Sequence, residues 1–170
     1  MLTPNTVDKK STIRRYVYLP CALCLLIFVS CQEQVIFEQN VDILDCAWDK
    51  DTPAYLTIAA PPDSVAGYYR LAINFRHTED YPYRNIYFFI TTTAPDGANL
   101  RDTVQYELAN EHGRWLGKIG RYWIDHRLLY RSRIRFPQQG DYLFGIQQGM
   151  RADTLYGAGA VGLRLEKMKD

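Results

Sequence analysis

The chain has 170 residues, of which 47% are hydrophobic and 23% are charged, a composition typical of a globular protein. It is too apolar for a disordered chain and too rich in charge for a bundle of membrane helices. The formal net charge is +1, and because residues 1–30 hold four cations and one anion, 16 cations and 18 anions remain behind them. A slightly acidic domain lacks the basic face that binds nucleic acid, so we exclude nucleic acid as a partner.

The N-terminal segment predicts a secretory signal. Lys9, Lys10, Arg14 and Arg15 precede an uncharged apolar run over residues 16–29. As a helix this run would reach about 21 Å, which is short of the roughly 30 Å hydrocarbon core of a bilayer. A basic stretch followed by so short a run is typical of a cleaved signal and not of a permanent membrane span. We therefore predict that residues 1–30 are a signal peptide.

The apolar run ends in Phe28-Val29-Ser30-Cys31, which resembles a bacterial lipobox. A lipobox places a small residue directly before the cysteine, because the signal peptidase must fit that residue beside a lipidated thiol; Phe28 stands where leucine is usual. We predict that Cys31 carries lipid, and the alternative is a core cysteine that happens to end an apolar run. Each buried CH₂ of an acyl chain contributes about 0.8 kcal/mol, so two or three chains hold a domain stably at a membrane. Residues 31–40 would then be a lipidated tether and residues 41–170 the folded domain.

The other cysteines indicate neither a disulfide framework nor a metal site. Cys21 and Cys24 have Cys-x-x-Cys spacing but lie inside the predicted signal, so neither stays in the mature protein. Cys46 is then the only free thiol, and we expect it to be a small buried apolar residue. The stability of the domain must come from its hydrophobic core.

Short runs of alternating apolar and polar residues indicate β-strands behind the anchor. Aromatic residues, 14% of the chain, favour the half-buried surfaces of sheets, and turns rich in proline or glycine separate the runs. About eight strands, spaced about a dozen residues apart, predict an all-β antiparallel sandwich of the jelly-roll or immunoglobulin-like type. Only residues 105–111 and 122–129 are weak candidates for a helix. The clearest strand patterns cover residues 69–76, 86–90, 130–136, 142–146 and 161–165.

The sequence behind the signal contains no recognisable catalytic or metal-binding motif. His77, His112 and His126 form no His-x-His or His-Glu-x-x-His pair, and we interpret them as structural or exposed side chains. There is no nucleophile elbow and no phosphate-binding glycine loop. Carboxylates such as Glu79 and Glu107 could form a glycosidase pair, but surface and turn positions are far commoner for such residues. We therefore expect a protein that is not an enzyme and that has no cofactor and no bound metal.

Arg131, Arg133 and Arg135 alternate with less polar residues in one of the predicted strands. Alternate residues of a strand share a face, so three guanidinium groups would line up about 6.6 Å apart. One interpretation is a solvated face, or an edge strand protected by charge from pairing with other chains. The other is a docking stripe for an acidic partner or for lipid phosphates, which suit the bidentate geometry of arginine.

Two other stretches place aromatic residues among charges or glycines. Tyr81 and Tyr83, followed by Arg84, either cover one end of the sandwich or are exposed anchors of a protein interface, where Tyr and Arg are enriched. Trp115 either packs into the hydrophobic core or is exposed as an aromatic contact for a partner. The candidate partner-binding residues are therefore Tyr81, Tyr83, Arg84, Trp115, Arg131, Arg133 and Arg135.

An ordered series of motifs carries a family resemblance. The motifs cover residues 48–51, 74–76, 80–87, 102–109, 136–142 and 161–166, together with Gly113-Arg114-Trp115-Leu116-Gly117 and Gln147-Gln148-Gly149-Met150-Arg151. In this order and spacing they resemble the gliding-motility-associated lipoprotein GldH family of the Bacteroidota; residues 118–129 depart from the pattern, which leaves any partner contact there open. The resemblance implies a cell-envelope lipoprotein associated with the gliding machinery, which in these bacteria is linked to type IX secretion, without catalytic residues or a cofactor. Because members also occur in bacteria that do not glide, envelope maintenance or secretion support stays open.

Two hypotheses for function follow from these observations, and a third is weaker. The first is a lipid-anchored scaffold of the cell envelope, expected at the outer membrane, that contacts other envelope or motility proteins. The second is a surface glycan-binding protein that stacks two coplanar, exposed aromatic rings on a sugar. The third is a lipid carrier, which would need an apolar cavity in a hollow barrel. The candidates for glycan stacking are Trp48, Trp115, Trp123, Tyr81 and Tyr83.

Overall fold

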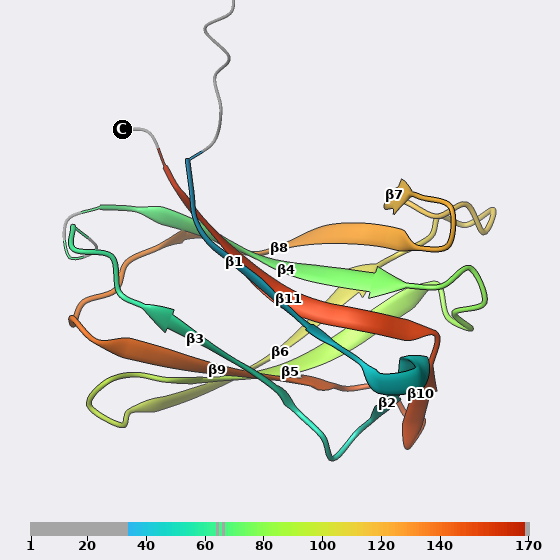
Figure 1. The fold of residues 1–170 in the computed structure, drawn as a ribbon, viewed down its shortest axis with the longest axis horizontal. Helices are drawn as coiled ribbons and strands as arrows, with labels where there is room; N and C mark the ends of the chain where they lie inside the picture. The colour runs from blue at the N-terminus through green and yellow to red at the C-terminus, as the bar shows by residue number, and fades with distance from the viewer. Residues whose placement is uncertain (1–33, 64, 66, 169–170) are drawn as a thin grey trace, which may run out of the picture. The chain divides into compact units, whose positions relative to one another are not determined.

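The structure, a computed structural model, describes residues 34–63, 65 and 67–168 (Figure 1). The predicted signal peptide and Cys31 lie outside these residues. Within the described ranges, no helix is both long enough and apolar enough to cross a bilayer. In chain order the elements are β1 (Gln34–Asp42), the 3₁₀ turn η1 (Leu44–Cys46), β2 (Ala47–Asp49), β3 (Ala54–Ala59), β4 (Tyr69–His77), β5 (Asn85–Thr93), β6 (Asn99–Glu107), β7 (Lys118–Ile119), β8 (Ile124–Ile134), β9 (Asp141–Gln148), β10 (Thr154–Tyr156) and β11 (Ala158–Lys167).

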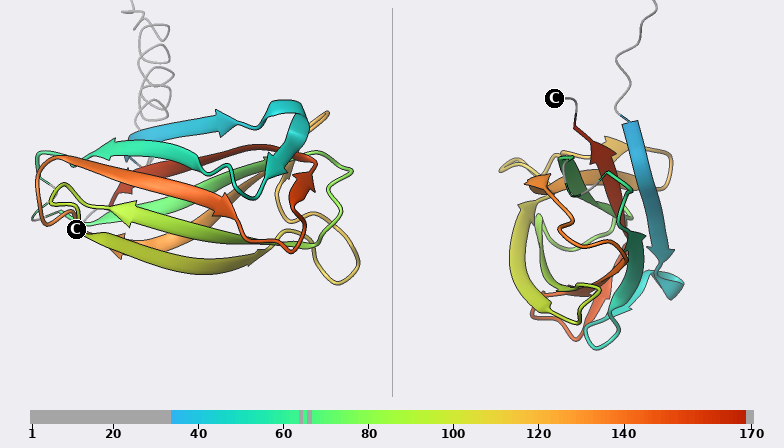
Figure 2. Two further views of the ribbon diagram at one scale, coloured as in Figure 1. Left: turned by 90° about the horizontal axis from the view of Figure 1, so that it is seen from below. Right: turned by 90° about the vertical axis from the view of Figure 1, so that its left-hand side faces the viewer.

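The longer strands form two antiparallel sheets. The five-stranded sheet has the order β1-β11-β4-β8-β7, and the four-stranded sheet has the order β3-β9-β5-β6. Figures 1 and 2 show these strands curling around a common core, with the short ribbon of β2 and β10 at one end. From β1 to β11 the long strands alternate between the two sheets, except that β5 and β6 pair as a hairpin. This connectivity is that of a jelly roll, so the prediction of an all-β antiparallel sandwich is confirmed.

Alternation along the strands decides which side chains form the core. Every second residue of β4 is buried from Tyr69 to His77, and β3 buries every second residue from Ala54 onward. The two sheets meet where Phe75 of β4 and Phe88 of β5 pack edge to face, with ring centroids 5.7 Å apart. Burying a side chain of this size contributes about 1.5–3 kcal/mol, so packing between the sheets dominates the stability of the domain.

Strand β8 contains two bulges that its sequence pattern does not reveal. Its pairing with β4 changes register between Tyr69 and Leu71, and again between Leu71 and Ala72. Each bulge inserts one extra residue into β8, which moves the following side chains to the opposite face of the sheet. The second bulge therefore returns the side chains to the faces they occupied before the first. The weak helix candidates 105–111 and 122–129 contain parts of β6 and β8 and no helix.

The domain begins earlier than the sequence pattern predicted. Residues 34–40, assigned to a tether, are part of β1, which pairs with β11 from Gln34 to Asp42. Because β1 lies at the edge of its sheet, only Phe37 and Val41 pack against the core, and the polar residues between them hide the strand pattern. Cys46 is half-buried in η1 instead of fully buried.

Candidate functional site

The outer face of the five-stranded sheet carries a groove of about 510 Å³. Since the inward positions of these strands hold apolar side chains, the outward positions are free to be polar. Ala160 of β11 lies at the bottom of the groove, and its small side chain leaves space between the longer side chains on either side. Its polar walls include Glu38, Asn40 and Asp42 of β1, Asn74 and Arg76 of β4, Asp125 and Arg127 of β8, and Lys118 of β7.

Strand register brings four charges into one row across this groove. Asp42 pairs in register with Ala160, Ala160 with Arg76, Arg76 with Asp125, and Asp125 with Lys118. The row therefore alternates in sign from β4 to β7. Within it, Arg76 Nε donates to Asp125 Oδ1 at 2.7 Å, and this hydrogen bond raises the pKa of Arg76.

The two ends of the row stay available to a ligand. Neither Asp42 nor Lys118 has an ion-pair partner among the described residues, although the negative charge of Asp42 also raises the pKa of Arg76. The side chain of Leu116 beside Lys118 is exposed. The groove thus presents a cation (Lys118), a carboxylate (Asp42) and an exposed apolar side chain (Leu116). Protein–protein interfaces have a similar mixed composition.

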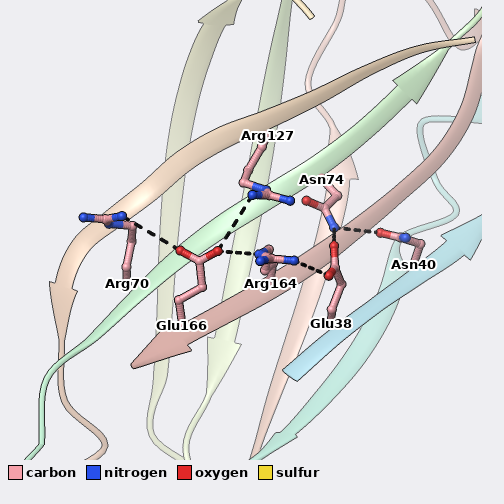
Figure 3. Close-up of polar contacts among 7 residues, drawn as sticks. All are labelled: Glu38, Asn40, Arg70, Asn74, Arg127, Arg164 and Glu166. Atoms are coloured by element: carbon pink, nitrogen blue, oxygen red, sulfur yellow. Dashed lines mark hydrogen bonds and ion pairs between the residues drawn. The ribbon is translucent and has the colours of Figure 1, made fainter. Parts of the chain in front are cut away.

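A polar network next to the groove holds four strands together (Figure 3). Glu166 of β11 is 4% exposed and accepts a hydrogen bond from Arg164 Nε, while Arg70 Nη1 and Arg127 Nη1 each lie 3.9 Å from its carboxylate. Arg164 also pairs with Glu38 of β1. A buried carboxylate is costly unless it is paired, so these ion pairs offset the cost of burying Glu166 and link the strands that carry its partners.

A buried histidine pair lies at the end of the sandwich opposite the start of β1. His77 Nδ1 and Thr78 O are 2.6 Å apart, and His77 Nε2 and His126 Nε2 are 3.0 Å apart. With Nδ1 of His77 donating to the carbonyl, its Nε2 accepts from His126. Burial lowers the pKa of His77, and burial together with His77 lowers the pKa of His126 to about 4, so both rings are neutral at pH 7. Nitrogens 3.0 Å apart leave no room for a metal between them, because each Zn–N bond needs about 2.0 Å.

A comparison with protein families identifies the domain that carries this groove. The model of the GldH lipoprotein matches residues 35–165, from the second residue of β1 into β11. The chain belongs to the GldH lipoprotein family. It is 29% identical to the "Gliding motility lipoprotein GldH homolog" of Christiangramia forsetii over 84% of this chain and 90% of the relative. It is 26% identical to the "Gliding motility lipoprotein GldH" of Flavobacterium johnsoniae over 85% of this chain and 92% of the relative.

Among solved structures, the chain is similar to one titled "Structure of infectious bursal disease virus Gt strain". The alignment covers 78% of this chain and 33% of the viral chain, with 9% identity and a TM-score of 0.27.

The aromatic candidates of this GldH family member gather near the histidine pair. Tyr81 is 4% exposed and packs on Phe75, so it belongs to the core and is not an exposed anchor. Trp115 is half-buried, with its ring centroid 4.5 Å from that of His77. Tyr83 is half-buried against Tyr81, and only Arg84 of this group is exposed. The structure thus places Tyr81 and Trp115 as packing residues.

The arginine candidates lie elsewhere and do not form one line. Arg131 donates to Asp102 of β6 at 2.6 Å across the open side of the sandwich. Arg133 and Arg135 instead lie over the ring of Tyr68, with Cζ 3.5 and 3.9 Å from its centroid. Beyond its two residues paired with β7, β8 is an edge strand, the position that charged residues protect from unwanted pairing.

The five aromatic residues predicted for glycan stacking offer no exposed pair of rings. Trp48 and Tyr81 are buried, and Trp115, Trp123 and Tyr83 are half-buried. Among the described residues, the exposed aromatic side chains are those of Tyr55, Tyr122 and Tyr156, which sequence reasoning did not select. It also missed the groove, since its residues come from strands far apart in the chain.

Proposed function

We propose that this GldH family member is a lipid-anchored, non-catalytic scaffold of the cell envelope, held at the outer membrane and bound to another protein of the gliding or type IX secretion machinery. The observation that carries the proposal is the family match over residues 35–165, which includes both sheets and the groove. The relatives named above are gliding motility lipoproteins, and the basic-apolar segment ending in Cys31 would supply the anchor.

The groove is the surface that we assign to the partner. A protein segment with charges in the opposite order would pair with Lys118 and Asp42, which have no ion-pair partner among the described residues, and would cover Leu116. Charge complementarity of this kind speeds association and selects one partner over others. A partner bound there would also lie against β7, which is short and at the edge of the sheet.

A non-catalytic role is supported by how the groups suited to acid–base chemistry are used. Both histidines of the buried pair are neutral and engaged in hydrogen bonds, and the Glu166 carboxylate is surrounded by three arginines. A general acid or base needs a pKa near the working pH and access to a substrate. None of these three groups meets both conditions.

Deletion and complementation in the native bacterium test the proposal. Deletion should impair gliding, type IX secretion or envelope integrity, and the wild-type chain should restore the lost trait. A Cys31→Ser variant should leave the membrane fraction and fail to complement. Unchanged gliding, secretion and envelope integrity after deletion would remove the scaffold role.

Crosslinking in intact cells followed by mass spectrometry tests the groove. Lys118→Glu combined with Asp42→Lys should abolish the crosslinked partner, because the charges at both ends of the row are then reversed and repel the partner's matching groups. Arg101→Glu is the matched control, since it changes an exposed cation on the four-stranded sheet. A partner recovered equally with the groove variant and the wild type rules out this surface.

A further inference from the structure

Two arginines share one tyrosine ring at the end of the sandwich where β1 begins. Arg133 and Arg135 lie within 3.9 Å of the centroid of Tyr68, and both side chains are exposed. Among the described residues, neither has a carboxylate within ion-pair distance. The ring stabilises both cations through its face but neutralises neither. This Arg133–Tyr68–Arg135 cluster therefore concentrates two positive charges on one small surface.

Strand register places the cluster beside the first residue of β1. Gln34 pairs with Lys167, Lys167 with Tyr69, and Tyr69 with Ile134, so one row runs from the start of β1 to the end of β8. Tyr68 directly precedes Tyr69, and its carbonyl accepts a hydrogen bond from Met168 N. Figure 1 shows the start of β1 next to the end of β11.

The other charges at this end are already occupied or lie on the other sheet. Asp63 pairs with Lys167, and Glu166 in the next row pairs with Arg164. Asp96, in the turn between β5 and β6, accepts hydrogen bonds from Ala98 N and Gln138 Nε2. Asp141 begins β9 in the four-stranded sheet. Among the described residues at this end, the two arginines are thus the cations without an anionic partner.

The position of Cys31 decides which anion is closest. Three peptide units separate Cys31 from Gln34, and an extended chain of that length spans at most about 11 Å. We propose that Arg133 and Arg135 bind the phosphates of anionic lipid headgroups in the membrane that holds the anchor, which fixes the direction in which the domain stands. The proposal rests on the anchor assigned above.

The chemistry of arginine suits this ligand. A guanidinium group donates two parallel hydrogen bonds to phosphate oxygens, and it keeps its charge while stacked on an aromatic ring. Each basic residue near an anionic bilayer strengthens binding about fivefold at moderate salt, so the pair should contribute about 25-fold. The groove row lies near the other end of β4, about 26 Å away along the strand, and would face away from the membrane.

Vesicle binding by the mature chain tests the proposal without the lipid. Residues 31–170 with Cys31→Ser contain every described residue and would be mixed with vesicles of phosphatidylcholine alone, or of phosphatidylcholine and phosphatidylglycerol at two to one. The protein should sediment with the anionic vesicles only, and high salt should release it. Arg133→Gln with Arg135→Gln should weaken this binding about 25-fold.

The matched control is Arg114→Gln with Arg121→Gln. Both arginines are exposed in the loops on either side of β7, near the end of the sandwich that holds the histidine pair, and Arg121 also lies over an aromatic ring, that of Tyr122. The control should bind anionic vesicles like the unsubstituted chain, and the circular dichroism spectra and melting temperatures of all forms should agree. Equal loss in both variants, or no preference for anionic vesicles, overturns the proposal.

Two further results separate this proposal from the anchor. If mass spectrometry finds no acyl chain on Cys31 while the vesicle result stands, the anchor fails and the headgroup contact does not. If Cys31 is acylated and the Arg133/Arg135 variant loses a crosslinked protein but keeps its vesicle binding, the cluster serves an acidic protein partner. That outcome refutes the lipid assignment.

Discussion

Gly162 of β11 pairs with Asn40 of β1, and its replacement by alanine tests how tightly the edge strand must approach. A Cβ at position 162 would overlap Asn40 Oδ1 and the carbonyl oxygen of Gln39, and would lie 2.8 Å from Asn40 Cα. Carbon atoms need about 3.5–4.0 Å, so β1 would have to move away by about 1 Å. Rotation of the Asn40 side chain cannot relieve a clash with backbone atoms.

The cost of Gly162→Ala follows from these contacts. Overpacking costs about 1–3 kcal/mol, and weakening two ladder hydrogen bonds adds about 2 kcal/mol. Loss of the conformational freedom of glycine in the unfolded chain offsets less than about 1 kcal/mol. The net loss is about 3 kcal/mol, which lowers the melting temperature of a domain of this size by about 10 °C.

Thermal unfolding and hydrogen exchange measure this effect. The amides of β1 should exchange faster in Gly162→Ala than in the wild type, while those of β5 and β9 should change little. Gly145→Ala is the matched control, because the three atoms nearest to its Cβ all belong to the ring of the exposed Tyr55, the closest at 3.0 Å, and that side chain can turn away. An unchanged melting temperature for Gly162→Ala, or an equal loss in both variants, would refute the reasoning.

Three other predictions concern charge, pH and burial. Glu166→Gln removes the buried carboxylate that Arg70, Arg127 and Arg164 share and should cost about 3–5 kcal/mol in urea unfolding, whereas Glu38→Gln at the exposed rim should cost less than about 1 kcal/mol. Similar losses in the two variants would contradict the role of burial. The pKa of His126 is about 4 in the folded domain and about 6.5 when unfolded, so its contribution of up to about 3 kcal/mol is complete above pH 6.5 and is lost as the pH falls toward 4. Urea unfolding from pH 7 to pH 4 should show this decline, and His126→Gln should flatten it; an identical pH profile in the variant would exclude His126 as its source. Tyr81→Ala should cost about 3–5 kcal/mol and Tyr83→Ala clearly less, as judged by melting temperature, and the reverse order would disprove the assignment of Tyr81 to the core.

The sandwich was predictable because burial on one face imposes a period of two on the sequence. The run 69–76 and the run 161–165 show that period, and both are central strands in the structure. Strand β1 was not predictable, since an edge strand touches the core at few positions and tolerates polar residues elsewhere. The bulges of β8 were hidden for another reason: two shifts of one residue cancel.

The candidate site could be predicted far less well. Asp42, Arg76, Asp125 and Lys118 belong to four strands, and only the pairing register of the sheet brings them into one row. One local signal was present, because the outward positions 160 and 162 of β11 hold the small residues Ala160 and Gly162.

Local composition also fails for residues whose role depends on the neighbouring sheet. Tyr81 has proline and charged residues around it, as an exposed anchor would, yet it packs on Phe75 in the core. Arg133 and Arg135 make cation–π contacts with Tyr68, which lies more than sixty positions earlier in the chain. Such pairings depend on topology, which the alternation of single strands does not encode.

The attachment of β1 to β11 has a mechanical consequence for the scaffold role proposed above. A pull on residue 34 resisted at the groove, near the other end of the sheet, would act along the length of β1. The hydrogen bonds along this nine-residue strand would then share the load in shear, instead of opening one at a time like a zipper. Tension along this axis is therefore the direction in which the sandwich resists rupture best, so in the proposed scaffold a pull from the anchor would be transmitted to the partner without unravelling β1.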